Sequence, residues 1–413
     1  MRVTNAIDTL SSKDVGGHDT GVVAAAAALV PALRARAAQT DALSKLPEAT
    51  IADFERARLF EMVLPKMYGG LQSSLNTYLD ALIEVARGDG SAAWTLGILS
   101  SGTWMAAALY PKHVTDQVFA TGDRFRTANA LAPRRAKTRR VAGGYVILDG
   151  LWMYNSGVYH AHWNQLGISL VDDAGHPIGL GAALIPTTNV TFLNDWDAIG
   201  LRGSGSTSVT VKDVFVPDER IALSSRNLQD EYASAHFRDV PAYRMPMIAL
   251  LPVRLICSII GMAKAALEIF MDKIGVRGIA FTTYDKQDEA AITHLQIGEV
   301  SAKIDAAQSI VRQCIRTLDE GAASGVRLTS QQRAQIWRDC GFSSKLLWEA
   351  VDRLAGALGT EFINRGASMN RVWHDVRVAC MHGGIYTSTC AEIYGRVAAG
   401  KMPNTFLLPE LTG

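Results

Sequence analysis

Residues that build disulfide frameworks and metal centres are scarce in this sequence. Only five cysteines occur among 413 residues, and they are odd in number and form no C-x-x-C pair. A disulfide scaffold and a cysteine-based zinc site are therefore not indicated. The histidine motifs H-x-x-x-H and H-E-x-x-H are also absent. We expect reduced thiols in a cytoplasmic protein and no bound metal.

An excess of charge of either sign is missing as well. The chain has 41 Lys and Arg against 40 Asp and Glu, a formal net charge of +1. This balance gives no field that would attract nucleic acid or a membrane surface. The apolar run Val22–Leu33 is too short to span a bilayer and follows the acidic residues Asp14 and Asp19, unlike a signal peptide. We expect an Ala-rich helix there, and neither nucleic acid nor membrane as a partner.

Three common sequence signatures of enzymes are not found. The chain lacks the phosphate-binding motif G-x-x-x-x-G-K-[ST], the nucleophile motif G-x-S-x-G and a fingerprint for NAD(P)H. The loop Gly200–Ser208, "GLRGSGSTS", is rich enough in glycine and hydroxyls to cradle a phosphate through its backbone. No parallel βαβ pattern surrounds this loop, however, so a dinucleotide-binding fold is disfavoured.

The pattern of apolar residues changes twice along the chain. Up to residue 120 it has the helical period, and "GDGS" at 88–91 separates two buried helices. Residues 121–235 alternate with period two and contain turn signals typical of a small β-barrel or sandwich. From residue 236 to 413 four long apolar or amphipathic segments predict a four-helix bundle, which buries further surface against a second subunit. The chain is therefore predicted to be an α+β protein with these three domains.

Three stretches concentrate polar chemistry. "WMYNSGVYHAHW" (Trp152–Trp163) contains His160 and His162, which would share one face of a strand but lack the third ligand that a metal site needs. The basic run 133–140 is typical of a solvated hairpin tip, or else of a surface that meets a phosphate-bearing ligand. His382, beside two glycines at the end of a helical run, suits proton transfer near neutral pH, unless it is a core or capping histidine.

The order of helical, β and helical-bundle segments, with "LPKMYGG", "GDGSAAW", "LDGLWMYNSG", "WDAIGLRGSGSTSVTVKDVFVPDER" and "RVWHDVRV", resembles the acyl-CoA dehydrogenase fold. Within it, the chain looks like the oxygenase components of two-component flavin-dependent monooxygenases, such as those acting on p-hydroxyphenylacetate, hydroxylated steroids, dibenzothiophene and indoles. The resemblance covers residues 40–400. It implies a homotetramer that receives FADH2 or FMNH2 by diffusion from a separate flavin reductase. It also implies that a C4a-hydroperoxyflavin formed with O2 hydroxylates a small phenol-like or indole-like substrate.

Acyl-CoA dehydrogenases, the other branch of the fold, use a glutamate to remove the α-proton of their substrate. The two positions where that base occurs fall here near Val253–Arg254 and at His382–Gly383, and neither holds a carboxylate. His382 coincides instead with a catalytic histidine of the monooxygenases and is expected to accept the proton of a phenol or indole N–H. N-oxygenases, S-oxygenases and dehydrogenase-type flavoenzymes stay open as alternatives.

The resemblance also assigns roles to individual residues. Ser156 matches the catalytic serine that hydrogen-bonds the flavin near N5. The other residues implied to contact the cofactor are Thr127, Asn129, Leu131, Asn155, Gly157, Arg277, Gly356, Gly359 and Phe362, of which Arg277 matches an arginine that reaches the flavin phosphate, often across a subunit interface. Several relatives carry a further histidine beside the tryptophan of the second helix, where this chain has Gly102, Thr103 and Met105. The substrate pocket is therefore expected to be lined by Trp104, Met105, Tyr159 and His160, whereas His162 is interpreted as structural.

Overall fold

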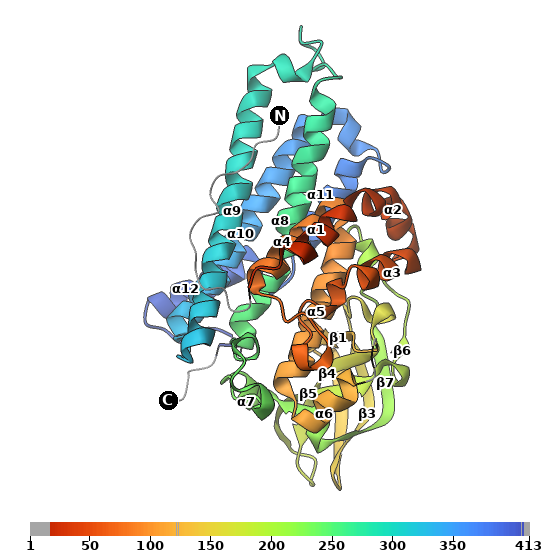
Figure 1. Ribbon diagram of the computed structural model, residues 1–413, viewed down its shortest axis with the longest axis vertical. Helices are drawn as coiled ribbons and strands as arrows, with labels where there is room; N and C mark the ends of the chain where they lie inside the picture. Colours follow the sequence, from red (N-terminus) through yellow and green to blue (C-terminus); the bar gives the residue numbers. More distant parts are fainter. Residues whose placement is uncertain (1–16, 121, 123, 406, 409–413) are drawn as a thin grey trace.

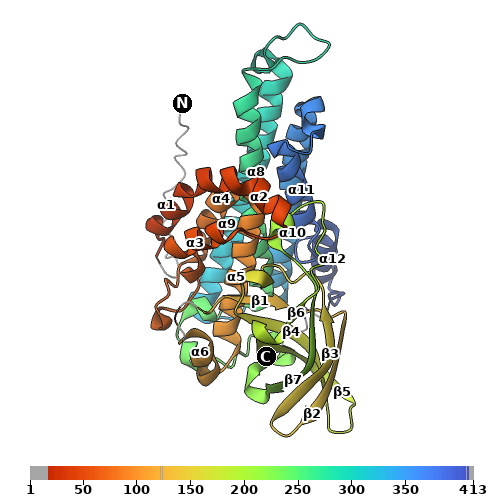
Figure 2. The ribbon, with the colours of Figure 1, turned by 90° about the vertical axis from the view of Figure 1, so that its right-hand side faces the viewer.

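The computed structural model describes residues 17–120, 122, 124–405 and 407–408. Long helices form one end of the molecule and two small sheets the other end, and the first helices lie between them (Figures 1 and 2). The predicted α+β class and the order of helical, β and helical segments are confirmed. The domain limits at residues 120 and 235 stay a prediction, and residues 1–16 of the first domain lie outside the described residues.

The first part of the chain is helical, and its central helix is α5 (Gly90–Leu109), almost every residue of which is buried. Asp89 caps α5 by accepting a hydrogen bond from the Ala92 backbone N–H at 3.0 Å. The central helix contacts α8 of the bundle, α4 and strand β1, so it joins the three parts of the molecule. The other helices of this part are α1 (Thr20–Ala28), α2 (Val30–Leu43), α3 (Glu48–Arg56), α4 (Leu75–Gly88) and α6 (Lys112–Phe119).

The β-domain contains two four-stranded sheets, with strand orders β1-β4-β5-β8 and β2-β3-β7-β6. Strands β1 and β4 pair in parallel, and the other neighbours pair antiparallel. The strands are β1 (Thr127–Ala130), β2 (Arg135–Val141), β3 (Gly144–Trp152), β4 (Trp163–Val171), β5 (Pro177–Pro186), β6 (Thr191–Phe192), β7 (Val209–Pro217) and β8 (Ile221–Leu223).

The basic run 133–140 does not form a hairpin tip, as one interpretation of the sequence expected. Most of it belongs to strand β2, and the turn to β3 follows it. Arg135 pairs with Asp149 on the neighbouring strand, and Arg140 pairs with Asp218. Carboxylates on β3 and directly after β7 therefore compensate two charges of the basic run. The spacing of residues along the chain did not reveal these partners.

The bundle has three long helices, α8 (Met247–Ile274), α9 (Ala291–Ser324) and α10 (Ser330–Ala357), and two short ones, α11 (Ser368–Cys380) and α12 (Thr387–Ala398). The last of the four predicted segments corresponds to α12, and α11 is an additional helix, separated from it by Gly383 and Gly384. A short helix, α7 (Ser224–Asn227), precedes the bundle. By length and composition α8 could cross a membrane, but 83% of its apolar stretch is buried inside the protein.

Helix α8 begins six residues before the segment that the sequence indicated, because it continues through Pro252. A proline inside a helix removes the backbone hydrogen bond to the carbonyl four residues earlier, here that of Ile248. The indole N–H of Trp337, on α10, donates to this carbonyl at 2.9 Å. The tertiary contact replaces the missing bond, so the proline does not end the helix.

Candidate functional site

Ser156 lies in the loop that follows strand β3, at the side of the β-domain facing α5. The loop turns sharply because Tyr154 and Gly157 adopt positive φ angles of 59° and 74°. The Gly157 backbone N–H donates to the Ser204 carbonyl at 2.8 Å, and the Asn155 N–H donates to the Thr207 carbonyl at 3.3 Å. These two bonds hold Ser156 against the glycine- and serine-rich loop 200–208.

Three serine hydroxyls form a chain in this place. Ser156 Oγ lies 2.6 Å from Ser206 Oγ, which in turn lies 2.6 Å from Ser204 Oγ. The indole N–H of Trp94, on α5, donates to Ser156 Oγ at 3.4 Å. All three hydroxyls are buried. The Trp94 N–H occupies one lone pair of the Ser156 oxygen, and either serine can be the donor between Ser156 and Ser206, so the Ser156 hydroxyl can turn its own proton toward a ligand.

Trp94 also joins Ser156 to His382. The Trp94 and His382 rings lie 5.8 Å apart between centroids and are inclined by 60°. The structure therefore brings both predicted catalytic residues into contact with one indole ring, although they are far apart in the sequence. Sequence reasoning missed Trp94 and Ser206, because only contacts between distant segments distinguish them from other tryptophans and serines of the chain.

The His382 ring has one nitrogen occupied by the backbone. The Gly384 N–H donates to His382 Nδ1 at 3.1 Å. In the neutral ring the proton is therefore on Nε2, and this nitrogen is a hydrogen-bond donor. The proton-accepting role predicted from the sequence needs the opposite tautomer, with an Nδ1 proton directed at the Gly384 N–H. In this geometry His382 donates through Nε2.

Desolvation by the surrounding protein lowers the pKa of His382 to about 4. The residue nevertheless remains accessible to solvent. Protein therefore surrounds much of this side chain, while one side stays open to solvent. The surrounding protein lowers the pKa of His382, and the open side limits how far it falls. The Gly384 N–H favours the neutral ring as well. His382 is thus an uncharged donor at neutral pH.

Asp375 on α11 connects the serine loop to the helix that leads to His382. Its Oδ1 accepts a hydrogen bond from the Leu201 backbone N–H at 2.5 Å. Burial and the neighbouring Asp89 carboxylate raise the pKa of Asp375 to about 8, whereas the Leu201 N–H and Arg371 oppose the rise. The buried acid therefore holds the start of the 200–208 loop from within the core.

The residues implied to contact the flavin ring are unequally placed. Thr127 is fully buried and its hydroxyl donates to the Phe125 carbonyl at 3.0 Å, so this hydroxyl points back along its own chain. Asn129 is half-buried and Leu131 is exposed. Asn155 is fully buried, and neither its amide nitrogen nor its amide oxygen has a partner among the described residues. An unsatisfied buried amide beside the fixed Ser156 hydroxyl fits a ligand that offers both donors and acceptors, as a flavin ring does.

Gly102, one of the three residues at which the chain departs from relatives with a further histidine, leaves no room for a side chain. A Cβ atom on Gly102 would lie 1.9 Å from the Thr127 carbonyl oxygen, because α5 packs directly on strand β1. The Gly102 carbonyl also accepts a hydrogen bond from Gln165 Nε2 at 2.8 Å. Any side chain here would push the central helix away from the sheet.

We expect Gly102→Ala to lower the free energy of unfolding by about 1–3 kcal/mol, because the added methyl overpacks a helix–strand contact made by backbone atoms. Urea denaturation followed by circular dichroism measures the change. The control is Gly298→Ala on α9, where a Cβ would meet no atom within 4 Å and where alanine favours the helix. Equal stability of Gly102→Ala and the parent protein would contradict the close packing.

The four residues predicted to line the substrate pocket do not come together. The Trp104 indole donates to the Ala242 carbonyl at 2.7 Å and packs against Arg254. Tyr159 turns toward the outer sheet, where its hydroxyl donates to Asn194 Oδ1 at 2.7 Å. These contacts do not support a shared pocket for Trp104 and Tyr159. The sequence pattern indicates which face of an element a side chain lies on, but not which residue it contacts. Met105 is buried on α5.

His160 and His162 do not lie on one strand, as the sequence pattern suggested. His160 ends the 3-10 helix η3 (Val158–His160), and His162 directly precedes strand β4. His160 is buried, and desolvation together with Arg126 and Lys45 lowers its pKa to about 4. Within the described residues no group of three or more His, Cys, Asp or Glu could hold a metal ion.

Arg277 and the segment 356–362 lie side by side, although not near Ser156. Gln287 connects them: its backbone N–H donates to the Arg277 carbonyl at 2.6 Å and its side chain to the Ala357 carbonyl at 3.0 Å. Arg277 Nη1 lies 3.4 Å from Glu361 Oε2. This turn between α8 and α9 is at the end of the molecule opposite the β-domain (Figure 1). A Cβ on Gly356 or Gly359 would meet no atom within 4 Å.

Comparisons with known proteins agree with this geometry. Residues 255–386 match the family described as acyl-CoA dehydrogenase, C-terminal domain. The structure of XiaF from Streptomyces sp. in complex with FADH2 and glycerol superimposes with a TM-score of 0.87 at 26% identity, covering 95% of this chain and 97% of that chain. The structure of 3-HSA hydroxylase from Rhodococcus sp. RHA1 gives a TM-score of 0.88 at 26% identity, with 95% and 100% covered.

Among curated proteins, the oxygenase subunit HsaA, a flavin-dependent monooxygenase of Mycobacterium tuberculosis, is 30% identical over 386 residues, 92% of this chain and 96% of its own. The oxygenase component of p-hydroxyphenylacetate 3-hydroxylase from Acinetobacter baumannii is 23% identical, with 91% and 88% covered. From these likenesses over nearly its whole length, the chain belongs to the flavin-dependent monooxygenases, as an oxygenase component that works with reduced flavin, dioxygen and a separate reductase.

Proposed function

We propose that this oxygenase hydroxylates the ring of a small phenol-like or indole-like substrate. The observation that carries the proposal is the arrangement of Ser156, Trp94 and His382, in which a hydrogen-bonded hydroxyl and a neutral imidazole donor both contact one indole ring. Support comes from relatives named as a resorcinol hydroxylase of Rhizobium sp. and an indole-3-acetate monooxygenase of Pseudomonas putida.

On the cofactor side, Ser156 and Asn155 are the residues that would hold the flavin ring. Reduced flavin, when bound, supplies the two electrons that let one oxygen atom enter the substrate while the other leaves as water. Ser156 offers a hydroxyl whose oxygen is held in place by Trp94 and Ser206. Fixed donors in a dry site lose little free energy in reorganisation, so they act more strongly than water would.

On the substrate side, His382 would orient the ring through its Nε2 proton. A phenol oxygen that accepts this hydrogen bond has a more acidic O–H, and the negative charge left when that proton passes to solvent is stabilised by the same hydrogen bond. The electron density of the ring then rises at the carbons ortho to the oxygen. This role needs a neutral His382, which burial and the Gly384 N–H favour.

Arg277, Gly356, Gly359 and Phe362 would serve the flavin of a neighbouring subunit in a homotetramer. The turn between α8 and α9, beside which they lie, is at the end of the molecule remote from the β-domain, which supports a role across a subunit interface (Figure 1). The open space around both glycines would let a ligand approach the backbone. The buried free cysteines support a cytoplasmic location.

A screen of product masses tests the substrate class. The protein is supplied with FMN or FAD, a flavin reductase and oxygen, and is offered phenols, indoles, amines and sulfides. We expect a product heavier by one oxygen atom from a phenol or an indole. Oxygenation of amines or sulfides alone would overturn the proposed class in favour of an N- or S-oxygenase.

We expect Ser156→Ala to release at least half of the consumed oxygen as hydrogen peroxide, because water replaces the fixed hydroxyl. Peroxide and hydroxylated product are measured together, as a ratio. Ser206→Ala, which removes the partner of Ser156, should give a smaller shift in the same direction. The control is Ser343→Ala, a buried serine that bonds to its own helix α10. An unchanged ratio in Ser156→Ala would refute the role of this hydroxyl.

A further inference from the structure

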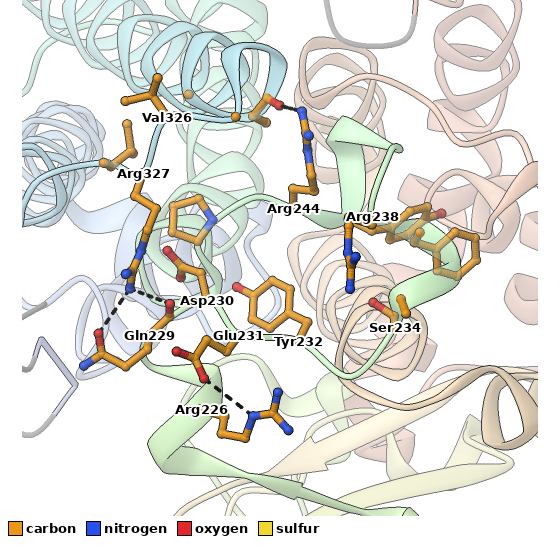
Figure 3. A pocket seen from close by; sticks show the side chains of 18 residues that line it. Arg226, Gln229, Asp230, Glu231, Tyr232, Ser234, Arg238, Arg244, Val326 and Arg327 are labelled. Carbon is orange, nitrogen blue, oxygen red and sulfur yellow. Dashed lines mark hydrogen bonds and ion pairs between the residues drawn. The ribbon is translucent and has the colours of Figure 1, made fainter. Parts of the chain in front are cut away.

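A second cavity, remote from Ser156, lies where the segment 226–246 meets the turn between α9 and α10. Its volume is about 420 Å³, enough for a small organic molecule. Figure 3 shows Arg238 and Arg244 extending from the 226–246 segment beside it, and Arg327 approaching from the α9–α10 turn. None of the predicted cofactor or catalytic residues lines this cavity. It therefore needs an explanation of its own.

The charges around the cavity are unbalanced. Four arginines line it against two carboxylates, Asp230 and Glu231. Both carboxylates already have cationic partners: Asp230 pairs with the buried Arg333, which is not part of the lining, and Glu231 with Arg226 at 3.6 Å. These pairs leave the charges of Arg238 and Arg244 uncompensated by the two acids.

Arg238 and Arg244 carry the argument. Among the described residues neither forms an ion pair with a carboxylate. Arg244 donates through Nη2 to the Ala322 carbonyl, which fixes its guanidinium across the gap between the two segments. Its Nε is buried without a partner. Arg238 is exposed and free to turn toward a ligand (Figure 3). Two guanidinium groups beside one cavity suit an oxyanion, which accepts two hydrogen bonds from each fork.

The rest of the lining is partly apolar. Phe237, Tyr243 and Leu328 are buried residues at the cavity wall. The Tyr232 hydroxyl is already used, since it donates to the Met245 carbonyl at 2.9 Å and accepts from the Met247 N–H at 2.7 Å. Aromatic rings and aliphatic side chains next to guanidinium groups fit an anion that carries an apolar body.

We propose that this cavity binds a small phosphate- or carboxylate-bearing molecule through Arg238 and Arg244. Tyr243 also lines another, smaller cavity, which reaches Trp104 and Arg254 in the core. Two sources share the chemistry of such a ligand: a free anion, or an aromatic compound with an acidic group. This proposal is independent of the proposed substrate class.

Isothermal titration calorimetry of the full chain tests the proposal, with oxidised FMN or FAD present in excess so that the flavin phosphate site is filled. Inorganic phosphate and phenyl phosphate are the two probes. We expect saturable binding that Arg238→Gln and Arg244→Gln each weaken about tenfold or more. The control is Arg139→Gln, which removes the same charge from an exposed position of strand β2. Arg238→Lys, which keeps the charge but loses the fork, should fall between the parent and Arg238→Gln.

The two probes distinguish the sources. Phenyl phosphate that binds more than tenfold tighter than inorganic phosphate supports an aromatic anion as the ligand, and equal affinities support a free anion. Absence of saturable binding, or binding that Arg238→Gln leaves unchanged, overturns the site. Arg238 is exposed, so its substitution tests the site even if Arg244→Gln were to unfold the protein.

Discussion

Replacing His382 with alanine is expected to lower the rate of hydroxylation at pH 7 by about 10²–10³-fold, the usual cost of removing a fixed donor from a developing negative charge. Flavin binding should change little, because Ser156 keeps its own hydrogen bonds to Trp94 and Ser206. Rapid mixing of the enzyme loaded with reduced flavin and substrate against oxygenated buffer measures product formation in one turnover.

The pH dependence distinguishes a hydrogen-bond donor from a proton acceptor with an ordinary histidine pKa. Desolvation lowers the pKa of His382 below its usual 6.5, so the ring is neutral at pH 7 and becomes a cation only at lower pH. In the cation Nδ1 carries a proton toward the Gly384 N–H, which breaks the bond that orients the ring. Hydroxylation should therefore not vary with the state of His382 between pH 7 and 8, and should fall only below pH 6.5.

His176→Ala, at the exposed turn between β4 and β5, is the control for removing an imidazole and should keep the parent's rate. A parent rate that rises through pH 6.5, in a way that His382→Ala abolishes, would contradict the donor role. It would show instead that the ring titrates in its ordinary range and accepts the proton, as the sequence first indicated.

The parts of this site that the sequence predicted are those attached to a local pattern. Ser156 and His382 stand beside glycines in recognisable segments, and the structure brings both to Trp94. Trp94 and Ser206 escaped prediction because their role depends on contacts across 50 residues or more, which no local pattern contains. The direction of the His382 proton depends on one backbone N–H, and two consecutive glycines do not reveal where it points.

The errors have a common physical origin. Trp104 and Tyr159 have the right size and polarity for a substrate pocket, but each is already committed to a partner in another segment. Similarly, the bond that compensates for Pro252 inside α8 comes from Trp337 on α10, which no local pattern shows. Composition and period predict the layers of this protein well. Which side chain satisfies which polar group is decided only when the layers meet.

A prediction on stability concerns Asp375, whose carboxyl is buried among Asp89 at the start of α5, Asp41 near the end of α2 and Arg371 on α11. Its pKa is raised from 3.8 to about 8 in the folded protein. Between these values the folded chain holds one more proton than the unfolded chain. The contribution of Asp375 to stability is therefore full below pH 4 and is lost as the pH rises through 8, at up to about 1.4 kcal/mol per pH unit.

Asp375→Asn keeps an oxygen for the Leu201 N–H but cannot ionise, so its free energy of unfolding should lack this loss. We expect the variant to gain on the parent by about 3–4 kcal/mol between pH 5 and 8, as measured by urea denaturation at each pH. The difference in free energy of unfolding between the two proteins removes the titration of groups that they share, and parallel curves would show that Asp375 is already ionised at neutral pH.

Because the Leu201 N–H begins the loop that carries Ser204 and Ser206, ionisation of Asp375 should also raise peroxide release by the parent above pH 8, and Asp375→Asn should suppress that rise.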